Sequence, residues 1–238
     1  MNQNSDGVPA AMAALPGPLA ERLWAAATTM SARSGKALVS LGAHSDSVYL
    51  VLKGHVRVTL YSLGGREVIL RSLGEGALFG ELAAIDGQPR SATIVALSNC
   101  TLAVIDAAAF REAVTADPES ALWLARRLAA QVRDLTERVF ELNALRVSSR
   151  LHCELLRLCS DAAGGEATHV TIDPAPTHAD LAARIGTHRE AVTREMGDLA
   201  ERGILSQERR RITVPDTRAL ARLVEMVVGG TSAAAEED

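Results

Sequence analysis

The longest regular pattern of apolar residues runs over residues 118–147 and repeats in alternating steps of four and three. This spacing is the narrow seam of a coiled coil, so it predicts a long helix that pairs with the same helix of a second copy. A helix buried within a monomer would show a broader apolar face. Asp117 can cap the helix with Pro118 at its first position, and Ser148 and Ser149 can cap a following helix, so two helices should meet near Arg146. The seam residues are Ala121, Ala125, Leu128, Val132, Leu135, Val139 and Leu142.

Before this helix the pattern is that of a β domain. Short runs of β-branched and aliphatic residues between residues 37 and 105 are separated by glycines, which is typical of an antiparallel sandwich or jelly roll. Gly64 and Gly65 mark a hairpin tip. Amphipathic helices are predicted over residues 18–30 and 107–114, on either side of the strands. The expected strands are residues 37–41, 47–52, 55–61, 67–73, 91–96 and 101–105.

After the long helix the pattern indicates a small domain. A helix carrying Leu151 and Leu155 is followed by two short helical patterns, residues 179–185 and 189–202, for which Thr177 and Thr187 are the N-cap candidates. Two strand-like pieces, residues 204–206 and 211–214, then flank a basic turn at residues 208–210. Together these features predict a helix-turn-helix with a β wing. The residues expected to point inward are Leu181, Ala182, Ile185, Val192, Met196 and Leu199.

Composition limits the class of protein. The chain has 238 residues, 47% of them apolar, which is enough for two hydrophobic cores. Its net charge of −4 means that contact with nucleic acid would have to come from a local basic patch. Cys100, Cys153 and Cys159 suit neither a disulfide framework nor a metal cluster, so a reducing cytoplasm is expected. We find no apolar run near the roughly 20 residues that span a membrane, and no export signal at the start.

Periodicity and composition together predict an α+β chain of several segments. Residues 1–17 and 229–238 offer little to bury and are expected to be disordered. Residues 18–116 form the β domain, residues 117–147 the long helix, and residues 148–228 the domain with the helix-turn-helix pattern.

Two short motifs near the end of the β domain, Phe-Gly-Glu-Leu and Arg-Ser-Ala-Thr, carry groups suited to a sugar phosphate. Gly80 allows the backbone to approach a ligand closely, and free N–H groups at the start of the following turn suit an anion. Arg90 offers a planar fork and Ser91 a hydroxyl to phosphate oxygens, while Glu81 can accept from a ribose hydroxyl. Taken alone, Glu81 and Arg90 would also fit a simple surface ion pair.

The second helix of the helix-turn-helix pattern carries charged residues on one face near its start. The arginines among them suit guanine O6 and N7, and a carboxylate accepts from cytosine N4, so Arg189, Glu190 and Arg194 can read a short half-site. The alternative is a solvated helix face. His178 on the first helix and the arginines of the wing, Arg209, Arg210 and Arg211, suit phosphate contacts. The candidate DNA-binding residues are Thr177, His178, His188, Arg189, Glu190, Arg194, Arg209 and Arg210.

In order along the chain, these motifs resemble those of transcription regulators of the cyclic-AMP receptor protein (CRP/FNR) family. The resemblance covers about residues 20–220 and includes Tyr-Leu-Val-Leu-Lys-Gly-His-Val at residues 49–56 and Gly-Thr-His-Arg-Glu-Ala-Val-Thr-Arg at residues 186–194. It implies a β-roll (jelly-roll) cyclic-nucleotide-binding domain, a long dimerisation helix and a C-terminal winged helix-turn-helix that binds DNA.

The resemblance also implies roles for individual residues. Glu81 would bind the ribose 2′-hydroxyl, and Arg90 with Ser91 the cyclic phosphate. The base would be read from the long helix, where Leu135-Thr136 stands in place of the Thr-Ser pair of the cyclic-AMP prototype. Losing the first hydroxyl leaves open which purine is preferred. The implied effector-binding residues are Leu70, Gly80, Glu81, Leu82, Arg90, Ser91, Leu135 and Thr136.

We therefore expect a homodimer that responds to a cyclic nucleotide, with cAMP as first candidate and cGMP as second. The resemblance implies that it binds an inverted repeat in double-stranded DNA with half-sites like TGTGA, and that RNA polymerase is its protein partner. No membrane, metal or catalytic role is expected, because no triad, metal set or P-loop occurs in the sequence. The alternatives are a regulatory subunit that controls a protein partner, and a family member whose β-roll is empty or holds another effector.

Overall fold

The computed structural model describes residues 7–163 and 167–233, and it divides into two compact units, Met1–Arg133 and Asp134–Asp238. The long helix α4, Pro118–Ala144, begins in the first unit and ends in the second.

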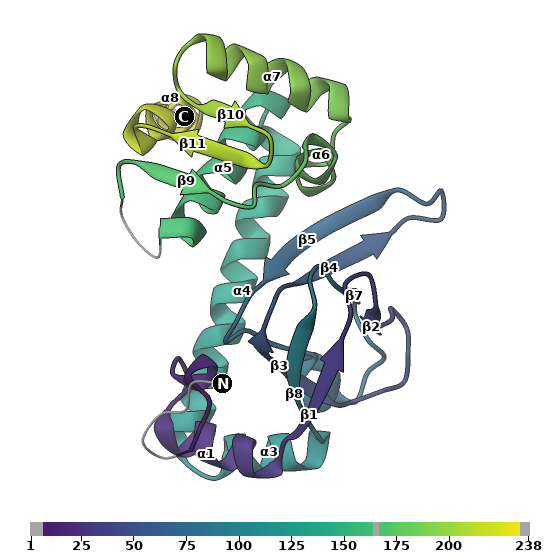
Figure 1. Cartoon of the computed structure of the whole chain (residues 1–238). Coiled ribbons are helices and arrows are strands. Elements are labelled where there is room, and N and C mark those ends of the chain that lie inside the picture. The colour runs from purple at the N-terminus through teal and green to yellow at the C-terminus, as the bar shows by residue number, and fades with distance from the viewer. Residues whose placement is uncertain (1–6, 164–166, 234–238) are drawn as a thin grey trace. The chain divides into compact units, whose positions relative to one another are not determined.

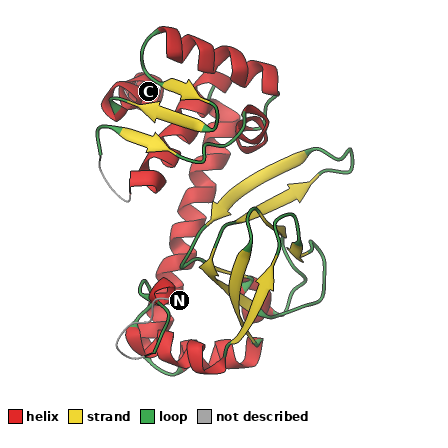
Figure 2. Ribbon diagram, in the orientation of Figure 1, coloured by secondary structure: helices red, strands yellow, loops and turns green. Residues whose placement is uncertain are grey.

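The first unit is built on two antiparallel sheets, with strand orders β1-β8-β3-β6 and β2-β7-β4-β5 (Figure 1). Helices α1 and α3 pack together at one end of the strands (Figure 2). The strands are β1 Thr28–Ala32, β2 Ala37–Val39, β3 Val48–Lys53, β4 Val56–Tyr61, β5 Glu67–Leu73, β6 Leu78–Phe79, β7 Thr93–Ala96 and β8 Cys100–Ile105. The other elements are η1 Ala10–Met12, α1 Gly17–Ala26, α2 Glu81–Asp86 and α3 Ala107–Thr115.

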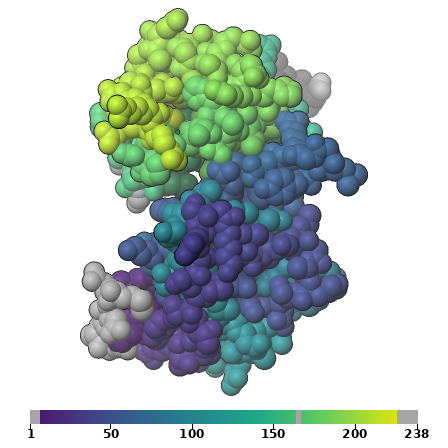
Figure 3. All heavy atoms as spheres, turned by 45° about the vertical axis from the view of Figure 1, so that its right-hand side comes forward, coloured from purple at the N-terminus to yellow at the C-terminus, as the bar shows by residue number. Residues whose placement is uncertain are grey.

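The six expected strands are all present, and the predicted hairpin tip lies between β4 and β5. This hairpin stands out from the first unit as an arm (Figure 3), and Leu63 at its tip is fully exposed. A β-bulge interrupts the ladder, because Thr59 pairs with Ile69 whereas Val58 pairs with Arg71, which leaves Leu70 without a partner residue. Bulges of this kind change the direction of neighbouring side chains.

Two expectations for the start of the first unit are wrong. Residues 7–17 are ordered rather than disordered, because Val8, Met12 and Leu15 join the same core as the buried leucines of α1. Residues 1–6 lie outside the described residues. The helix predicted over residues 18–30 is too long, since α1 ends at Ala26 and β1 follows as the antiparallel neighbour of β8. Pairing with an existing strand outweighs the local helical pattern there.

The N-terminus of α4 is capped as predicted. Asp117 accepts hydrogen bonds from the Ser120 backbone N–H and hydroxyl, both at 2.8 Å, and it also pairs with Arg22. The backbone and hydroxyl hydrogen bonds from Ser120, followed by the Arg22 contact, lower the pKa of Asp117 to about 2. The cap therefore stays ionised over the whole physiological pH range.

The second unit contains the end of α4, a three-stranded antiparallel sheet of order β10-β11-β9, and four further helices among the described residues. All six side chains predicted to point inward are buried in its core. The elements are α5 Val147–Ala163, β9 Val170–Ile172, α6 His178–Ile185, α7 Arg189–Glu201, β10 Ser206–Glu208, β11 Arg211–Val214 and α8 Thr217–Ala233.

Boundaries in the second unit differ from expectation in several places. The helices α4 and α5 do meet at a break beside Arg146, but Ser148 and Ser149 lie within the first turn of α5 instead of capping it. The N-cap of α7 is His188, one residue after Thr187, and its side chain makes no capping hydrogen bond. Thr177 caps α6 as predicted, in a reciprocal capping box with Asp180.

The wing and the C-terminus account for the remaining differences. The first wing strand, β10, lies two residues later than residues 204–206, because Glu208 pairs with Arg211 across a two-residue turn in which Arg209 has a left-handed φ of 53°. The strand β9 was not predicted, and α8 extends to Ala233, into the tail expected to be disordered from residue 229 onwards. Residues 234–238 lie outside the described part.

Candidate functional site

A small hollow lies in the first unit between the second sheet and the segment from β6 to β7. It contains five of the predicted effector residues. Leu70 is absent from the lining and packs against the neighbouring core. The lining residues are Val39, Val58, Arg71, Phe79, Gly80, Glu81, Leu82, Ala83, Arg90, Ser91, Ala92 and Ile94.

Arg90 is the central cation of this hollow and is only 3% exposed. Its Nε donates to Ser45 Oγ at 2.9 Å, its Nη1 to the Gly80 carbonyl at 2.8 Å, and its Nη2 to the Ser47 carbonyl at 2.7 Å. The guanidinium also lies 5.9 Å from the centre of the Tyr49 ring. Since a guanidinium has five N–H groups, one on each terminal nitrogen remains for an anionic ligand.

Gly80 gives Arg90 the room to occupy this position. The residue has a left-handed φ of 83°, and a Cβ there would lie 2.7 Å from Arg90 Nη1 and 2.9 Å from the Ser47 carbonyl oxygen. Any side chain at this position would therefore displace the guanidinium as well as strain the backbone. This close approach is the reason for the glycine that the sequence motif contains.

Glu81 is the acidic group of the hollow, and it is 2% exposed. Its Oε1 accepts a hydrogen bond from Gln131 Nε2 on α4 at 3.1 Å. Arg127, one helical turn before Gln131, donates a hydrogen bond to the Leu78 carbonyl at 2.6 Å. The negative charge of Glu81 favours the charged form of Arg127. Burial lowers the pKa of Arg127, and Glu81 partly offsets this effect. The carboxylate is therefore buried beside cationic and amide donors.

The predicted base-reading residues lie elsewhere on α4. Leu135 and Thr136 follow Arg133 and so belong to the second unit, where both side chains are exposed in the single chain. Their role in binding the base stays a prediction.

A second candidate surface is formed by the exposed face of α7. Arg189, Glu190 and Arg194 are exposed on it, while Val192 and Met196 on the opposite face are buried. No hydrogen bond or ion pair within the described part of the chain engages the three charged side chains. They are therefore free to contact base edges, which is what a recognition helix requires.

The other predicted DNA-binding residues surround this face. His178 lies between two neighbours, with Nδ1 2.9 Å from Thr193 Oγ1 on α7 and Nε2 3.3 Å from Gln207 Oε1 on the wing. Arg209 and Arg210 are exposed at the wing tip. Thr177 and His188 are the N-cap residues of α6 and α7. His178 therefore joins the two helices and the wing, a structural role that the sequence did not indicate.

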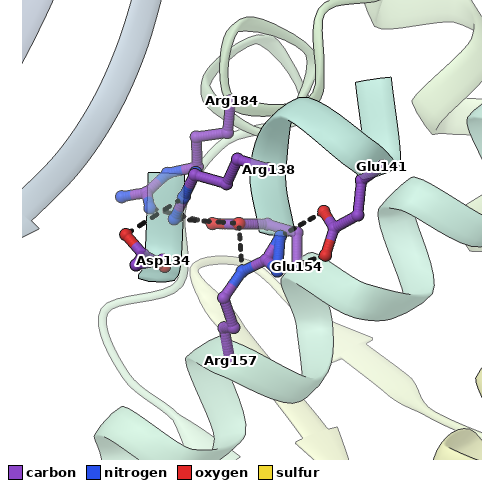
Figure 4. A network of polar contacts seen from close by, with 6 residues as sticks. All are labelled: Asp134, Arg138, Glu141, Glu154, Arg157 and Arg184. Atoms are coloured by element: carbon purple, nitrogen blue, oxygen red, sulfur yellow. Dashed lines mark hydrogen bonds and ion pairs between the residues drawn. The ribbon is translucent and has the colours of Figure 1, made fainter. Parts of the chain in front are cut away.

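A polar network within the second unit holds α5 against its neighbours (Figure 4). Glu154 on α5 is 1% exposed and accepts from Arg184 Nη1 on α6 at 2.9 Å and from Arg157 Nε at 3.3 Å. Arg138 on α4 lies 3.8 Å away from it, and Arg157 also binds both carboxylate oxygens of Glu141 at 2.7 Å. One buried carboxylate thus connects the end of α4 with the first helix of the helix-turn-helix.

Two family models and several known proteins match this chain. A model of the cyclic nucleotide-binding domain matches residues 29–117, and a model of the Crp-like helix-turn-helix domain matches residues 149–223. The global nitrogen regulator of Synechococcus elongatus is 32% identical over 191 residues, which are 79% of this chain and 86% of that protein. This chain belongs to the CRP/FNR family of transcription regulators. The family consists of regulators rather than enzymes, and its winged helix-turn-helix members bind DNA and act as dimers.

Other relatives of this CRP/FNR regulator agree. The cAMP-activated global transcriptional regulator CRP of Pasteurella multocida is 31% identical over 188 residues, covering 78% of this chain and 88% of that protein. A CRP/FNR family regulator of Thermus thermophilus matches in structure with a TM-score of 0.66 and 29% identity, over 83% of this chain and 98% of that one. The predicted fold of β-roll, long helix and winged helix-turn-helix is thereby confirmed.

Several residues that shape the sites of this CRP/FNR regulator were missed from the sequence. Ser45 holds Arg90 through a hydroxyl outside any motif, and Ser47 holds it through a backbone carbonyl, which the residue type does not reveal. Arg127 and Gln131 also contact the pocket region, and they lie four residues apart on α4. Two polar residues on the same face of a helix that also carries the seam could have indicated a buried polar contact. On α7, Glu195 Oε1 lies 2.8 Å from Nε2 of the buried His152, which ties the recognition helix to α5.

The remaining features of the described residues concern metal ligands, membrane-spanning helices and cysteines. They contain no group of three His, Cys, Asp or Glu side chains placed to hold a metal ion, and none of their helices is long and apolar enough to cross a membrane. All three cysteines are free and buried. Burial raises the pKa of Cys153 and of Cys159 to about 11, so both thiols are poorly reactive at neutral pH.

Proposed function

We propose that this CRP/FNR regulator is a homodimer whose β-roll pocket binds a cyclic purine nucleotide and whose winged domains then bind an inverted repeat in DNA. The observation that supports the effector is the pairing of buried Arg90 with buried Glu81 in one hollow of a cyclic nucleotide-binding domain. An anion-binding fork and a hydroxyl acceptor are the two groups that a ribose cyclic phosphate needs.

The first candidate effector is cAMP, because relatives in Pasteurella multocida and Mycobacterium tuberculosis carry the name of cAMP-activated regulators. In this proposal Glu81 binds the ribose hydroxyl, Arg90 and Ser91 bind the phosphate, Gly80 and Leu82 line the site, and Thr136 with Leu135 contacts the base. The second candidate is cGMP, because Leu135 lacks a hydroxyl that could bind adenine. Calorimetry with both nucleotides on the 238-residue chain tests the proposal, and binding of neither would refute it.

We further propose that Arg189, Glu190 and Arg194 read the bases, while His178, His188, Thr177, Arg209 and Arg210 support phosphate contacts. The supporting observation is the exposed charged face of α7 within a Crp-like helix-turn-helix. Two-fold symmetry would place the half-sites about one helical turn apart, roughly 34–36 Å. By its family, the half-site is proposed to be TGTGA-like, RNA polymerase to be the protein partner, and the cytoplasm to be the location of this DNA-bound function.

The base-reading role predicts sequence-dependent losses of affinity. Arg189→Ala and Arg194→Ala should each weaken binding by about 1–3 kcal/mol per half-site, because each removes a guanidinium that can bind one guanine. Arg210→Ala should weaken all sequences to a similar degree, since a wing-tip arginine would contact phosphate. Anisotropy titration of palindromic and scrambled duplexes, with and without nucleotide, measures both effects. Equal losses on both duplexes for Arg189→Ala would contradict the assignment.

The dimer rests on the seam of α4, which is largely exposed in the single chain. Val132, Leu135, Val139 and Leu142 are 61%, 51%, 59% and 48% exposed, as expected for a surface awaiting a partner helix. We expect Val139→Glu to raise the dimer dissociation constant roughly 10- to 100-fold, because each subunit would bury an unpaired carboxylate.

Sedimentation velocity measures the dimer dissociation constant, with Glu137→Gln as the control variant because Glu137 lies on α4 outside the seam. The control should remain dimeric at concentrations where Val139→Glu dissociates. An intact Val139→Glu dimer would place the interface elsewhere.

A further inference from the structure

Arg71 is a second arginine of the effector pocket, and no motif of the sequence pointed to it. It lies on β5 directly after the bulged Leu70, and it lines the hollow together with Glu81 and Arg90. A bulge changes the direction of the next side chains along a strand, so the irregular ladder explains why an arginine of the sheet reaches the pocket. Arg71 therefore reaches the pocket because of the bulge in β5, and not only because the residue is an arginine.

The other charged groups at the pocket already have protein partners. Three N–H groups of Arg90 are bound by Ser45, Ser47 and Gly80, and Glu81 is held by Gln131. Arg127 donates to a backbone carbonyl. Among the described residues, no hydrogen bond or ion pair engages Arg71. It is instead close enough to Arg127 to repel it, since the pKa of Arg127 is lowered chiefly by burial and in addition by the charge of Arg71.

An unpaired cation held close to another cation is stabilised when a ligand supplies acceptors. In the proposed function, the phosphate of the nucleotide occupies Arg90 and Ser91, and the ribose occupies Glu81. The part of the ligand left for Arg71 is the base. The chemistry of an arginine then decides which purine suits it, because a guanidinium only donates hydrogen bonds.

The two purines differ at the edge that an arginine prefers. Guanine presents two adjacent acceptors, O6 and N7, whereas adenine presents the N7 acceptor beside the N6 amino donor. A guanidinium can therefore form two hydrogen bonds with guanine, but its second N–H would face another donor on adenine. We propose that Arg71 reads the purine edge of the effector and shifts the preference of the pocket toward a 6-oxopurine nucleotide such as cGMP. This inference rests on the proposed binding of a cyclic nucleotide.

The test is calorimetry of the unmodified 238-residue chain and of its Arg71→Leu and Arg71→Lys variants with cAMP, cGMP and cyclic inosine monophosphate. The inosine nucleotide has the O6 and N7 acceptors but lacks the 2-amino group of guanine. We expect Arg71→Leu to weaken cGMP and the inosine nucleotide by roughly 5- to 150-fold and cAMP by less than about threefold, as loss of one bidentate contact implies. Arg71→Lys keeps the positive charge but lacks the planar guanidinium, so this variant should also lose most of the preference for the two 6-oxopurine nucleotides over cAMP.

Arg33→Leu controls for the change of net charge, since Arg33 is exposed and outside the lining, and it should leave all three affinities unchanged. Thermal melting without nucleotide verifies that each variant is folded. Equal weakening of all three nucleotides by Arg71→Leu would show that Arg71 serves the phosphate, and would overturn the inference. An inosine nucleotide that behaves like cAMP would overturn it as well, by assigning discrimination to the 2-amino group. If the unmodified chain binds none of the three, the proposed function itself fails.

Discussion

Replacing Arg90 with leucine is expected to reduce affinity for the cyclic nucleotide by roughly 100- to 10,000-fold, because two charge-assisted hydrogen bonds to the phosphate are lost at about 1.5–3 kcal/mol each. In the described pocket, Arg90 lines the hollow together with Ser91, the residue proposed to bind the phosphate with it. Arg71 and Arg127 cannot replace it, since they lie on other elements and Arg127 is bound to the Leu78 carbonyl. Calorimetry measures the loss.

Two further variants, Arg90→Lys and Glu81→Ala, serve as comparisons for Arg90→Leu. Arg90 also supports the fold, because Ser45, Ser47 and Gly80 accept its hydrogen bonds, so thermal melting must accompany the titration. Arg90→Lys retains the charge and is expected to stay folded while losing the planar fork. Glu81→Ala should lose less, about 1.5–3 kcal/mol for one ribose contact. If Glu81→Ala lost as much as Arg90→Leu, the two roles would be ranked wrongly, and a folded Arg90→Leu with unchanged affinity would remove the phosphate from this site.

Replacing Glu154 with alanine is expected to lower the free energy of unfolding of the second unit by about 3–5 kcal/mol, as removal of one partner from a buried ion pair does. The carboxylate is 1% exposed and lies among Arg138, Arg157 and Arg184. Of these, the Arg184 side chain is itself only 8% exposed, and the substitution would remove the carboxylate that lies 2.9 Å from its guanidinium. Arg157 would keep its bidentate partner Glu141.

Urea denaturation followed by two signals separates the units. Both tryptophans, Trp24 and Trp123, belong to the first unit, so their fluorescence should report an almost unchanged transition, whereas circular dichroism should show earlier loss of helix. Asp134→Asn is the matched control, because Asp134 pairs with Arg138 in the same network but its side chain is 42% exposed, and it should cost less than about 1 kcal/mol. Equal effects of the two variants would show that Glu154 is not the centre of the network.

Patterns of apolar residues predicted the elements that bury one face. The strands from β3 to β5, the helix α7 and its inward residues followed from periodicity because each repeats over several turns or pleats. The strand β1 was mistaken for the end of α1, since its partner β8 lies far along the chain and pairing at that distance leaves no local signal. The two-residue β6 and three-residue β9 are too short to show a period.

The residues of the effector pocket likewise fall into two groups, those that a local sequence motif could identify and those that depend on tertiary contacts. Gly80, Glu81, Arg90 and Ser91 belong to compact motifs, so they could be identified together and the hollow contains them all. Arg71 could not be identified, because its position depends on a bulge, and a bulge is a property of how two strands pair. Gln131 meets Glu81 only because α4 passes the pocket 50 positions later in the chain. Contacts that depend on tertiary structure are those that periodicity cannot supply.

The way Arg90 is held bears on competition by other anions. Burial and the hydrogen bonds to Ser45, Ser47 and Gly80 mean that the guanidinium is already dehydrated and oriented when the chain folds. An incoming phosphate group does not have to rearrange it, and inorganic phosphate would meet the same N–H groups as a nucleotide does. Selectivity against such abundant small anions must then come from the ribose and the base, which only a nucleotide offers to Glu81 and Arg71.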